Sequence, residues 1–271
     1  MDSIHTKAAI LGIVTAFSSL VLALPTKSLQ HFMGQTTLSR QYFKFHSQAL
    51  DKAEQENYRD VILDYTNALQ VGEQLKFIDA RTYTNRGLAH HKLQNYQAAI
   101  EDFDRSLELH PRRAHTYNNR GMARYKLGDK QGAIADYTQA LHFDPNFSEA
   151  YSNRGIAFLR SGNIEDAIAD LAYALNLDPY LIEAYYNRGN AYLKQGSYNE
   201  AIADYTQALK LNPDLALAYY NRGNARYGLG DRQAAIKNLR IAAQLFYKQG
   251  NEGNYQRTLN LLQKLQNSMV R

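Results

Sequence analysis

Asparagine recurs along the chain every 34 residues, at positions 85, 119, 153, 187 and 221. A carboxamide carries both a hydrogen-bond donor and an acceptor, so a row of them can pair with a peptide backbone without requiring a particular ligand side chain. One interpretation of the row is therefore a face that pairs with a peptide backbone. Two alternatives are that these amides join neighbouring units together or face water. The row comprises Asn85, Asn119, Asn153, Asn187 and Asn221.

Arginine follows each of these asparagines, and in most cases an aspartate follows the arginine at a constant separation. We predict an Arg–Asp ion pair that fixes the register of two antiparallel helices. Exposed pairs contribute only about 0–1 kcal/mol, so such a pair would specify the fold more than stabilise it. It should fail at both ends of the array, where Gln48 precedes Asp64 and where Asn238 replaces the acid. The predicted pairs are Arg86–Asp102, Arg120–Asp136, Arg154–Asp170 and Arg188–Asp204.

The same period governs the elements that would carry these side chains. In residues 114–147, apolar side chains from Ala133 to Leu141 recur at helical spacing, and Pro145 ends that helix because proline cannot continue it. A glycine such as Gly121 stands inside each first helix, where it costs roughly 1 kcal/mol relative to alanine. Its recurrence predicts a close approach of the partner helix. A period of about 34 residues is typical of a solenoid of stacked helix pairs.

One unit shows the full pattern, with aromatic, small and proline residues at Tyr117, Gly121, Ala133, Tyr137, Ala140 and Pro145. This pattern resembles that of the tetratricopeptide repeat (TPR) family. The resemblance implies an all-α fold, a right-handed α-solenoid of stacked antiparallel helix pairs (the TPR superhelix). Complete repeats are expected at 80–113, 114–147, 148–181, 182–215 and 216–249.

The two ends of the array depart from the pattern. We expect a degenerate TPR-like unit over residues 41–79, preceded by a linker at 25–40. The last repeat has Tyr247 where the others have proline, so its second helix should run longer. Residues 250–271 should form a capping helix with a polar outer face.

In TPR proteins the first helices of successive repeats line a concave groove that commonly holds a peptide, so the resemblance implies such a groove here. Its side chains would be rich in tyrosine and mildly basic, with Lys92 adding charge, and would favour an acidic partner. The alternative is that half of these side chains only pack. Besides the asparagine row, the expected groove residues are Asn118, Tyr125, Lys126, Arg160, Tyr186, Asn190, Lys194, Tyr220, Asn224 and Tyr227.

One group of TPR domains binds the C-terminal carboxylate of chaperones through a lysine–asparagine set. This chain comes nearest at Tyr186, Asn190 and Asn221, but tyrosine replaces the lysine. Binding of chaperone tails is therefore not expected.

Composition and motifs argue against catalysis. The chain has no cysteine, and its eight histidines, including the neighbours His90 and His91, do not stand at metal-site spacing. No nucleophile motif or glycine-rich phosphate loop is present, so we expect no enzyme and no cofactor. The net charge of +5 is scattered, which makes a helical-repeat nucleic-acid binder only the alternative to a protein-interaction scaffold.

Residues 8–24 form an uninterrupted, mainly apolar run that is followed by Pro25. The length of this run lies between a typical signal-peptide core and a membrane-spanning helix, so a cleaved signal, an anchor and a helix packed on the solenoid all remain open. We expect an exported or membrane-anchored scaffold that assembles complexes at or beyond the membrane, with membrane contact only through residues 8–24 if they are retained. A cytosolic adaptor is the less favoured alternative, and the oligomeric state stays open.

Overall fold

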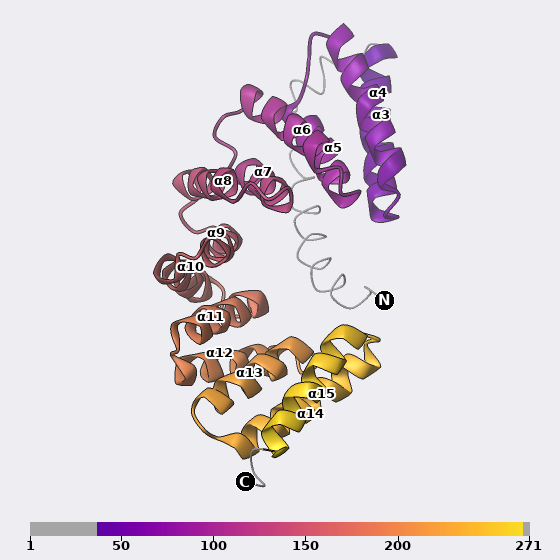
Figure 1. Ribbon diagram of the computed structural model, residues 1–271. Helices are drawn as coiled ribbons and strands as arrows, with labels where there is room; N and C mark the ends of the chain where they lie inside the picture. Colours follow the sequence, from indigo (N-terminus) through magenta and orange to yellow (C-terminus); the bar gives the residue numbers. More distant parts are fainter. Residues whose placement is uncertain (1–36, 268–271) are drawn as a thin grey trace. The chain divides into compact units, whose positions relative to one another are not determined.

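The computed structural model describes residues 37–267, which form thirteen α-helices and no strand. The chain divides between Arg112 and Arg113 into two compact units, here called unit 1 and unit 2 (Figure 1). The helices of unit 1 are α3 (Thr37–Glu54), α4 (Tyr58–Gln74), α5 (Ala80–Lys92) and α6 (Tyr96–Leu109). Those of unit 2 are α7 (Ala114–Lys126), α8 (Lys130–Phe143), α9 (Ser148–Ser161), α10 (Ile164–Leu177), α11 (Ile182–Gln195), α12 (Tyr198–Leu211), α13 (Ala216–Gly228), α14 (Arg232–Lys248) and α15 (Glu252–Asn267).

The predicted fold class, an all-α solenoid of antiparallel helix pairs, is confirmed. Within each unit every helix packs against the next one along the chain. Helix α3 begins at Thr37, so residues 37–40, which the sequence analysis assigned to a linker, are its first turn. The apolar run at residues 8–24 lies outside the described residues. No helix between residues 37 and 267 has both the length and the apolar character needed to cross a bilayer.

Glycines inside the first helices allow the paired helices to approach closely, as predicted. A Cβ atom built on Gly121 would lie 2.7 Å from Cε1 of Tyr137 and 3.2 Å from the carbonyl oxygen of Ala133. A Cβ on Gly155 would lie 2.8 Å from Cγ of Leu171. Real Cβ atoms essentially never lie within 3.0 Å of another atom, so a larger residue at these positions would displace the packed side chain or separate the two helices.

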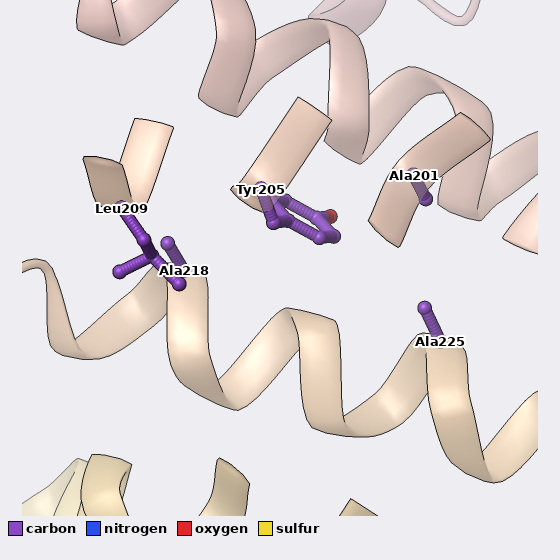
Figure 2. Close-up of a cluster of buried hydrophobic side chains, with 5 residues drawn as sticks. All are labelled: Ala201, Tyr205, Leu209, Ala218 and Ala225. Atoms are coloured by element: carbon purple, nitrogen blue, oxygen red, sulfur yellow. The ribbon is translucent and has the colours of Figure 1, made fainter. Parts of the chain in front are cut away.

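The core of each unit lies between the helices of successive pairs. Figure 2 shows one cluster, in which Ala201, Tyr205 and Leu209 of α12 face Ala218 and Ala225 of α13. All five side chains are buried. Residues 201, 205 and 209 are four apart and therefore share one face of their helix. The two alanines let the backbone of α13 approach the ring of Tyr205.

The C-terminal end of the array follows the sequence prediction. Helix α14 has 17 residues, against 14 in α8, α10 and α12. Helix α15 buries Thr258, Leu262 and Leu265 and packs on α14. Its other side is polar and exposed, as a capping element requires. The exposed polar residues include Gln256, Asn260, Lys264 and Asn267.

Candidate functional site

In unit 2 the first helices of successive repeats lie side by side and form one face of the solenoid. Helix α7 contacts α9 directly, α9 contacts α11, and α11 contacts α13, whereas contacts between successive second helices are sparser. Side chains at equivalent positions of the four first helices therefore lie next to one another. This is the face on which the groove residues were predicted.

The repeated arginines contact the repeated aspartates in all four predicted pairs. The shortest N–O distance in each pair is 2.6–2.7 Å, and each guanidinium donates through both Nε and one Nη atom. Asp136 also accepts from Arg124 at 2.9 Å. Since the two partners come from the paired helices of one repeat, each pair fixes the register of those helices.

The prediction that these pairs are exposed was wrong. Only 2–11% of each aspartate side chain and 15–20% of each arginine side chain reach solvent. The close approach at the neighbouring glycine brings both groups into the space between two helices. Removing one partner would therefore leave a buried charge, which costs far more than breaking a surface pair.

At the two ends of the array the Arg–Asp pair is absent, as predicted, but another bond takes its place. Asp64 accepts from Lys52 at 2.6 Å. Nε of Arg222 donates to Oδ1 of Asn238 at 2.8 Å. Burial lowers the pKa of Arg222, whereas the hydrogen bonds to Asp170 and Asp204 raise the pKa of their arginine partners.

Each arginine also contacts the preceding helix or an aromatic ring. Nη1 of Arg86, Arg154 and Arg222 donates to Thr66, Thr138 and Thr206 respectively, at 3.0–3.1 Å. The five repeated guanidinium groups lie 5.3–5.8 Å from the centroid of a tyrosine ring on their own helix. The repeated arginines are thus engaged within the fold and do not form a free basic stripe for a nucleic acid.

Three of the five repeated asparagines bond to the preceding repeat, which is the alternative that the sequence left open. Nδ2 of Asn85 donates to the hydroxyl of Tyr65 at 3.2 Å, and Nδ2 of Asn153 donates to Oδ1 of Asn118 at 3.0 Å. Asn187 donates to a carbonyl of its own helix, and the half-buried side chain of Asn119 makes no hydrogen bond to the described residues. The fifth, Asn221, belongs to a larger group.

That group, here called the amide cluster, consists of Tyr186 and Asn190 from α11, Tyr205 from α12 and Asn221 from α13. Oδ1 of Asn190 accepts from the Tyr205 hydroxyl and from Nδ2 of Asn221, each at 2.8 Å. Nδ2 of Asn221 also lies 3.2 Å from the Tyr186 hydroxyl. Asn190, Asn221 and Tyr186 are half-buried, so a ligand can reach them. The cluster joins two repeats and holds both amides in fixed orientations.

The bonds within the amide cluster do not use all of its hydrogen-bonding capacity. They occupy Oδ1 of Asn190 and Nδ2 of Asn221. A hydrogen bond from Asn190 also opposes the effect of burial on the pKa of Tyr186, so one Nδ2 hydrogen of Asn190 points to that hydroxyl. The second Nδ2 hydrogen of Asn190 and the lone pairs on Oδ1 of Asn221 remain, since each amide has two donors and two acceptor sites. A donor and an acceptor on two amides that bond to each other suit the carbonyl and N–H groups of an extended peptide backbone.

The other predicted groove residues divide into two sets. Tyr125 and Tyr220 are half-buried and pack against core clusters, so they belong with the packing alternative. Asn224 is half-buried, and Tyr227 is 38% exposed. Lys126, Arg160 and Lys194 are exposed, one at the end of each of three successive first helices.

Sequence reasoning missed the hydroxyl of Tyr205, which it treated only as a packing residue. The equivalent residue is Phe103, Leu171 or Leu239 in three other repeats and tyrosine at Tyr65 and Tyr137, so an aromatic hydroxyl at this otherwise apolar position was the available signal. A buried tyrosine hydroxyl usually finds a hydrogen-bond partner. Here that partner is Asn190, which the sequence did place in the groove.

In unit 1 a histidine, His46, occupies the region that corresponds to the amide cluster. Nε2 of His46 lies 2.8 Å from Oγ1 of Thr82, and its ring packs 5.3 Å from that of Tyr65. Tyr42 completes the group, with its hydroxyl 3.0 Å from the same Thr82 oxygen. Burial lowers the pKa of His46 to about 4, so the ring stays neutral and part of the core.

Unit 1 also has a hollow of about 550 Å³ beside α5 and α6. Its two arginines, Arg86 and Arg105, are paired with Asp102 and Glu108. In the part of the chain that the structure describes, no three histidine, aspartate or glutamate side chains come together in a way that could hold a metal ion. His90 and His91 diverge, with His90 beside Asp102 and His91 against Tyr96.

The comparisons with known proteins identify the repeat. A tetratricopeptide repeat model matches residues 80–113, and a TPR repeat model matches 121–162, 157–196 and 189–230, together more than half of the chain. No curated protein is a significant match.

Several solved structures share the fold. The MamA protein is 25% identical with a TM-score of 0.57, and the alignment covers 64% of this chain and 94% of MamA. PilF of Pseudomonas aeruginosa is 16% identical with a TM-score of 0.69, covering 83% and 99% of the two chains. YrrB, described as a TPR protein with an unusual peptide-binding site, is 21% identical with a TM-score of 0.56, covering 67% and 91%.

The family models match the same repeats that carry the Arg–Asp pairs and the amide cluster. The chain belongs to the tetratricopeptide repeat family and is a non-catalytic protein-interaction scaffold.

Proposed function

We propose that unit 2 binds an extended segment of a partner protein along its first helices, with the amide cluster pairing with the backbone of that segment. The observation that carries this proposal is the direct bond between two half-buried amides, Asn190 and Asn221, which keep one donor hydrogen and one acceptor oxygen outside the bonds of the cluster. The three hydrogen bonds within the cluster hold these groups in place before a ligand arrives, which lowers the entropic cost of binding.

A photocrosslinking experiment tests the proposed face. The full chain carries p-benzoylphenylalanine in place of Tyr227 on first helix α13, or in place of Tyr173 on second helix α10. These two tyrosines are 38% and 45% exposed and form a matched pair. We expect an adduct with the partner at position 227 and none at 173. Equal adducts at both positions would contradict the proposed face.

A second variant tests the amide cluster itself. Asn190→Ala removes the acceptor of two cluster bonds and should reduce the adduct at position 227 several-fold. Asn176→Ala is the control, since Asn176 is exposed on the second helix α10 and lies outside the proposed face. Should both variants crosslink like the parent chain, the amide cluster does not bind the partner.

We also propose that residues 8–24 direct the chain to the membrane or across it, where the scaffold assembles a complex. The support is that this segment is mainly apolar and has no charged residue in the sequence. An intact-mass measurement on native protein from fractionated cells tests it. A mass about 23–25 residues short indicates a cleaved signal, and a full-length mass in the membrane fraction indicates an anchor. A full-length mass confined to the soluble cytosolic fraction would contradict the proposal.

A further inference from the structure

The exposed cations of unit 2 form a row in register, here called the cation row: Lys126, Arg160 and Lys194. They occupy equivalent positions of successive repeats, at the ends of α7, α9 and α11. Among the described residues, none of the three forms an ion pair. The repeated arginines, by contrast, form ion pairs with aspartates within the fold.

The cation row is confined to three repeats of unit 2. In α13 the equivalent residue is Gly228, and a Cβ built there would lie only 2.5 Å from the Tyr198 ring, so any side chain would have to displace that ring. In unit 1 the equivalent residue is Lys92, which is half-buried and whose pKa is lowered by burial. The exposed row is therefore a local feature of α7, α9 and α11, and it does not extend to every repeat.

The cation row adjoins the amide cluster. Burial raises the pKa of the Tyr186 hydroxyl, while its hydrogen bond to Asn190 and the positive charge of Arg160 act in the opposite direction. The geometric link is on α11, where Asn190 of the cluster and Lys194 of the row are four residues apart and therefore share one face of the helix. Lys130 at the start of α8 donates to the carbonyl oxygen of Arg160 at 3.0 Å and adds a further positive charge beside the row.

The spacing of the row suits one backbone conformation. Successive first helices are in direct contact, so their axes lie roughly 8–10 Å apart, and equivalent side chains repeat at about that interval. A polyproline II segment advances about 9 Å in three residues and returns each third side chain to the same face. An α-helix also returns to the same face after two turns, about 10.5 Å, but its backbone groups bond within the helix and are not available to the amide cluster. An extended strand alternates its side chains between two faces.

We propose that the segment bound by unit 2 is an acidic, polyproline II-like segment with carboxylates three residues apart, one for each member of the cation row. This inference rests on the proposed peptide-binding function and specifies the chemistry of the ligand. The carboxylates pair with Lys126, Arg160 and Lys194, while Asn190 and Asn221 bond to the backbone between two of them. Opposite charge then selects the partner, and the amides tolerate any intervening side chains.

Fluorescence anisotropy with the full chain and three labelled synthetic peptides tests this inference. Each peptide carries three aspartates in the same proline–alanine–serine background, spaced two, three or four residues apart. We expect the peptide with three-residue spacing to bind at least about fivefold more tightly than the others, since a correctly placed exposed ion pair contributes up to about 1 kcal/mol. Equal affinities for all three spacings would overturn the proposed register.

A pair of variants separates specific contacts from general electrostatic attraction. Arg160→Met should weaken binding of the three-residue-spaced peptide about three- to fivefold, the effect of losing one exposed ion pair. Lys210→Met, which removes an exposed cation at the end of the second helix α12, should leave it unchanged. Circular dichroism of both variants checks that the helices remain intact, because cations at helix ends also offset the helix dipole. Equal weakening by both variants would overturn the inference.

The crosslinking experiment distinguishes failure of this inference from failure of the proposed function. A partner segment that crosslinks at position 227 and lacks acidic residues would overturn the acidic ligand and leave the peptide-binding face intact. An acidic peptide whose affinity is unaffected by Asn190→Ala, together with no adduct at position 227, would overturn the proposed function itself. Failure of all three peptides to bind at millimolar concentration would overturn the inference.

Discussion

Units 1 and 2 use one repeat pattern for different local structures, and the turns between paired helices show this first. In unit 2 the turn residue with positive φ is glycine in every pair, at Gly128, Gly162, Gly196 and Gly230. In unit 1 the equivalent residues are Glu56 and Gln94, with φ of 58° and 61°. Non-glycine residues are disfavoured in this region by steric clash, so the turns of unit 1 carry strain that those of unit 2 avoid.

The two units also differ in the residues that surround the region of the candidate site. Unit 1 fills this region with His46, Tyr42 and Tyr65, and its lysine Lys92 is half-buried. Unit 2 places half-buried amides and exposed cations there. The repeat therefore specifies the helix pair, while a few positions decide whether this region holds aromatic rings and a neutral histidine, as in unit 1, or amides and exposed cations, as in unit 2. We place the binding face in unit 2 for this reason.

The largest expected difference between the units concerns the buried carboxylates. Asp136 in unit 2 accepts from two arginines, and its side chain is 2% exposed. Asp136→Ala should lower the free energy of unfolding by about 3 kcal/mol or more, because two buried guanidinium groups lose their partner. Hydrogen exchange followed by mass spectrometry would show faster exchange in α7 and α8.

The matched variant in unit 1 is Asp64→Ala, whose partner Lys52 is 30% exposed and can turn to water. It should cause a clearly smaller increase in exchange in α3 and α4. An effect of Asp64→Ala as large as that of Asp136→Ala would contradict this expected difference.

The second difference is the response to acid. Burial lowers the pKa of His46 to about 4 and also lowers that of His90, both in unit 1. In the unfolded chain His46 takes up its proton near pH 6.5, so between about pH 6.5 and 4 the unfolded state binds more protons than the folded state. The stability of unit 1 should therefore fall by about 3 kcal/mol as the pH is lowered through this window.

Hydrogen exchange at a series of pH values, corrected for the intrinsic rate, would measure this response in each unit. His46→Gln keeps a polar partner for Thr82 without the titration, so it should flatten the profile of unit 1. A profile for unit 1 that is unchanged by His46→Gln would contradict the assignment to this side chain.

A third prediction sharpens the comparison at the ends of the array. Asn238→Asp would give Arg222 the carboxylate partner that the other complete repeats have. It should stabilise the α13–α14 pair by about 1 kcal/mol, because hydrogen bonds to charged groups are stronger than those between neutral groups. The loss of the bond from Asn238 to the Ala234 carbonyl, 2.7 Å in this structure, limits the gain. Thermal unfolding followed by circular dichroism measures it, and a lower melting temperature would show that this bond outweighs the added charge.

The smallest expected effect concerns the turns. Gln94→Gly should stabilise unit 1 by about 0.5–1 kcal/mol, because glycine adopts positive φ without steric cost but loses more entropy on folding. The reverse change in unit 2, Gly162→Ala, should destabilise by about 1 kcal/mol; a Cβ there meets no atom within 4 Å, so only the backbone conformation is tested. Equal and negligible effects would show that the two types of turn do not differ in strain.

The sequence predicted the architecture well because each structural requirement recurs at the same place in every repeat. The mid-helix glycines predicted the close approach of paired helices, and the absence of a proline at position 247 predicted the longer α14. The candidate site was harder to predict. Tyr186, Asn190 and Asn221 were placed on one face, but Tyr205 was not, because its hydroxyl reaches them from a second helix.

The sequence by itself determined the period of the repeat, the helix pairs and which arginine meets which aspartate. These depend on periodicity and on contacts within one pair. Only the tertiary structure decided that the Arg–Asp pairs are buried, that three repeated asparagines bond to the preceding repeat, and that Asn190 and Asn221 keep a free donor and acceptor. Burial and hydrogen-bond partners depend on how successive pairs stack, and identical residues in different repeats acquire different neighbours there.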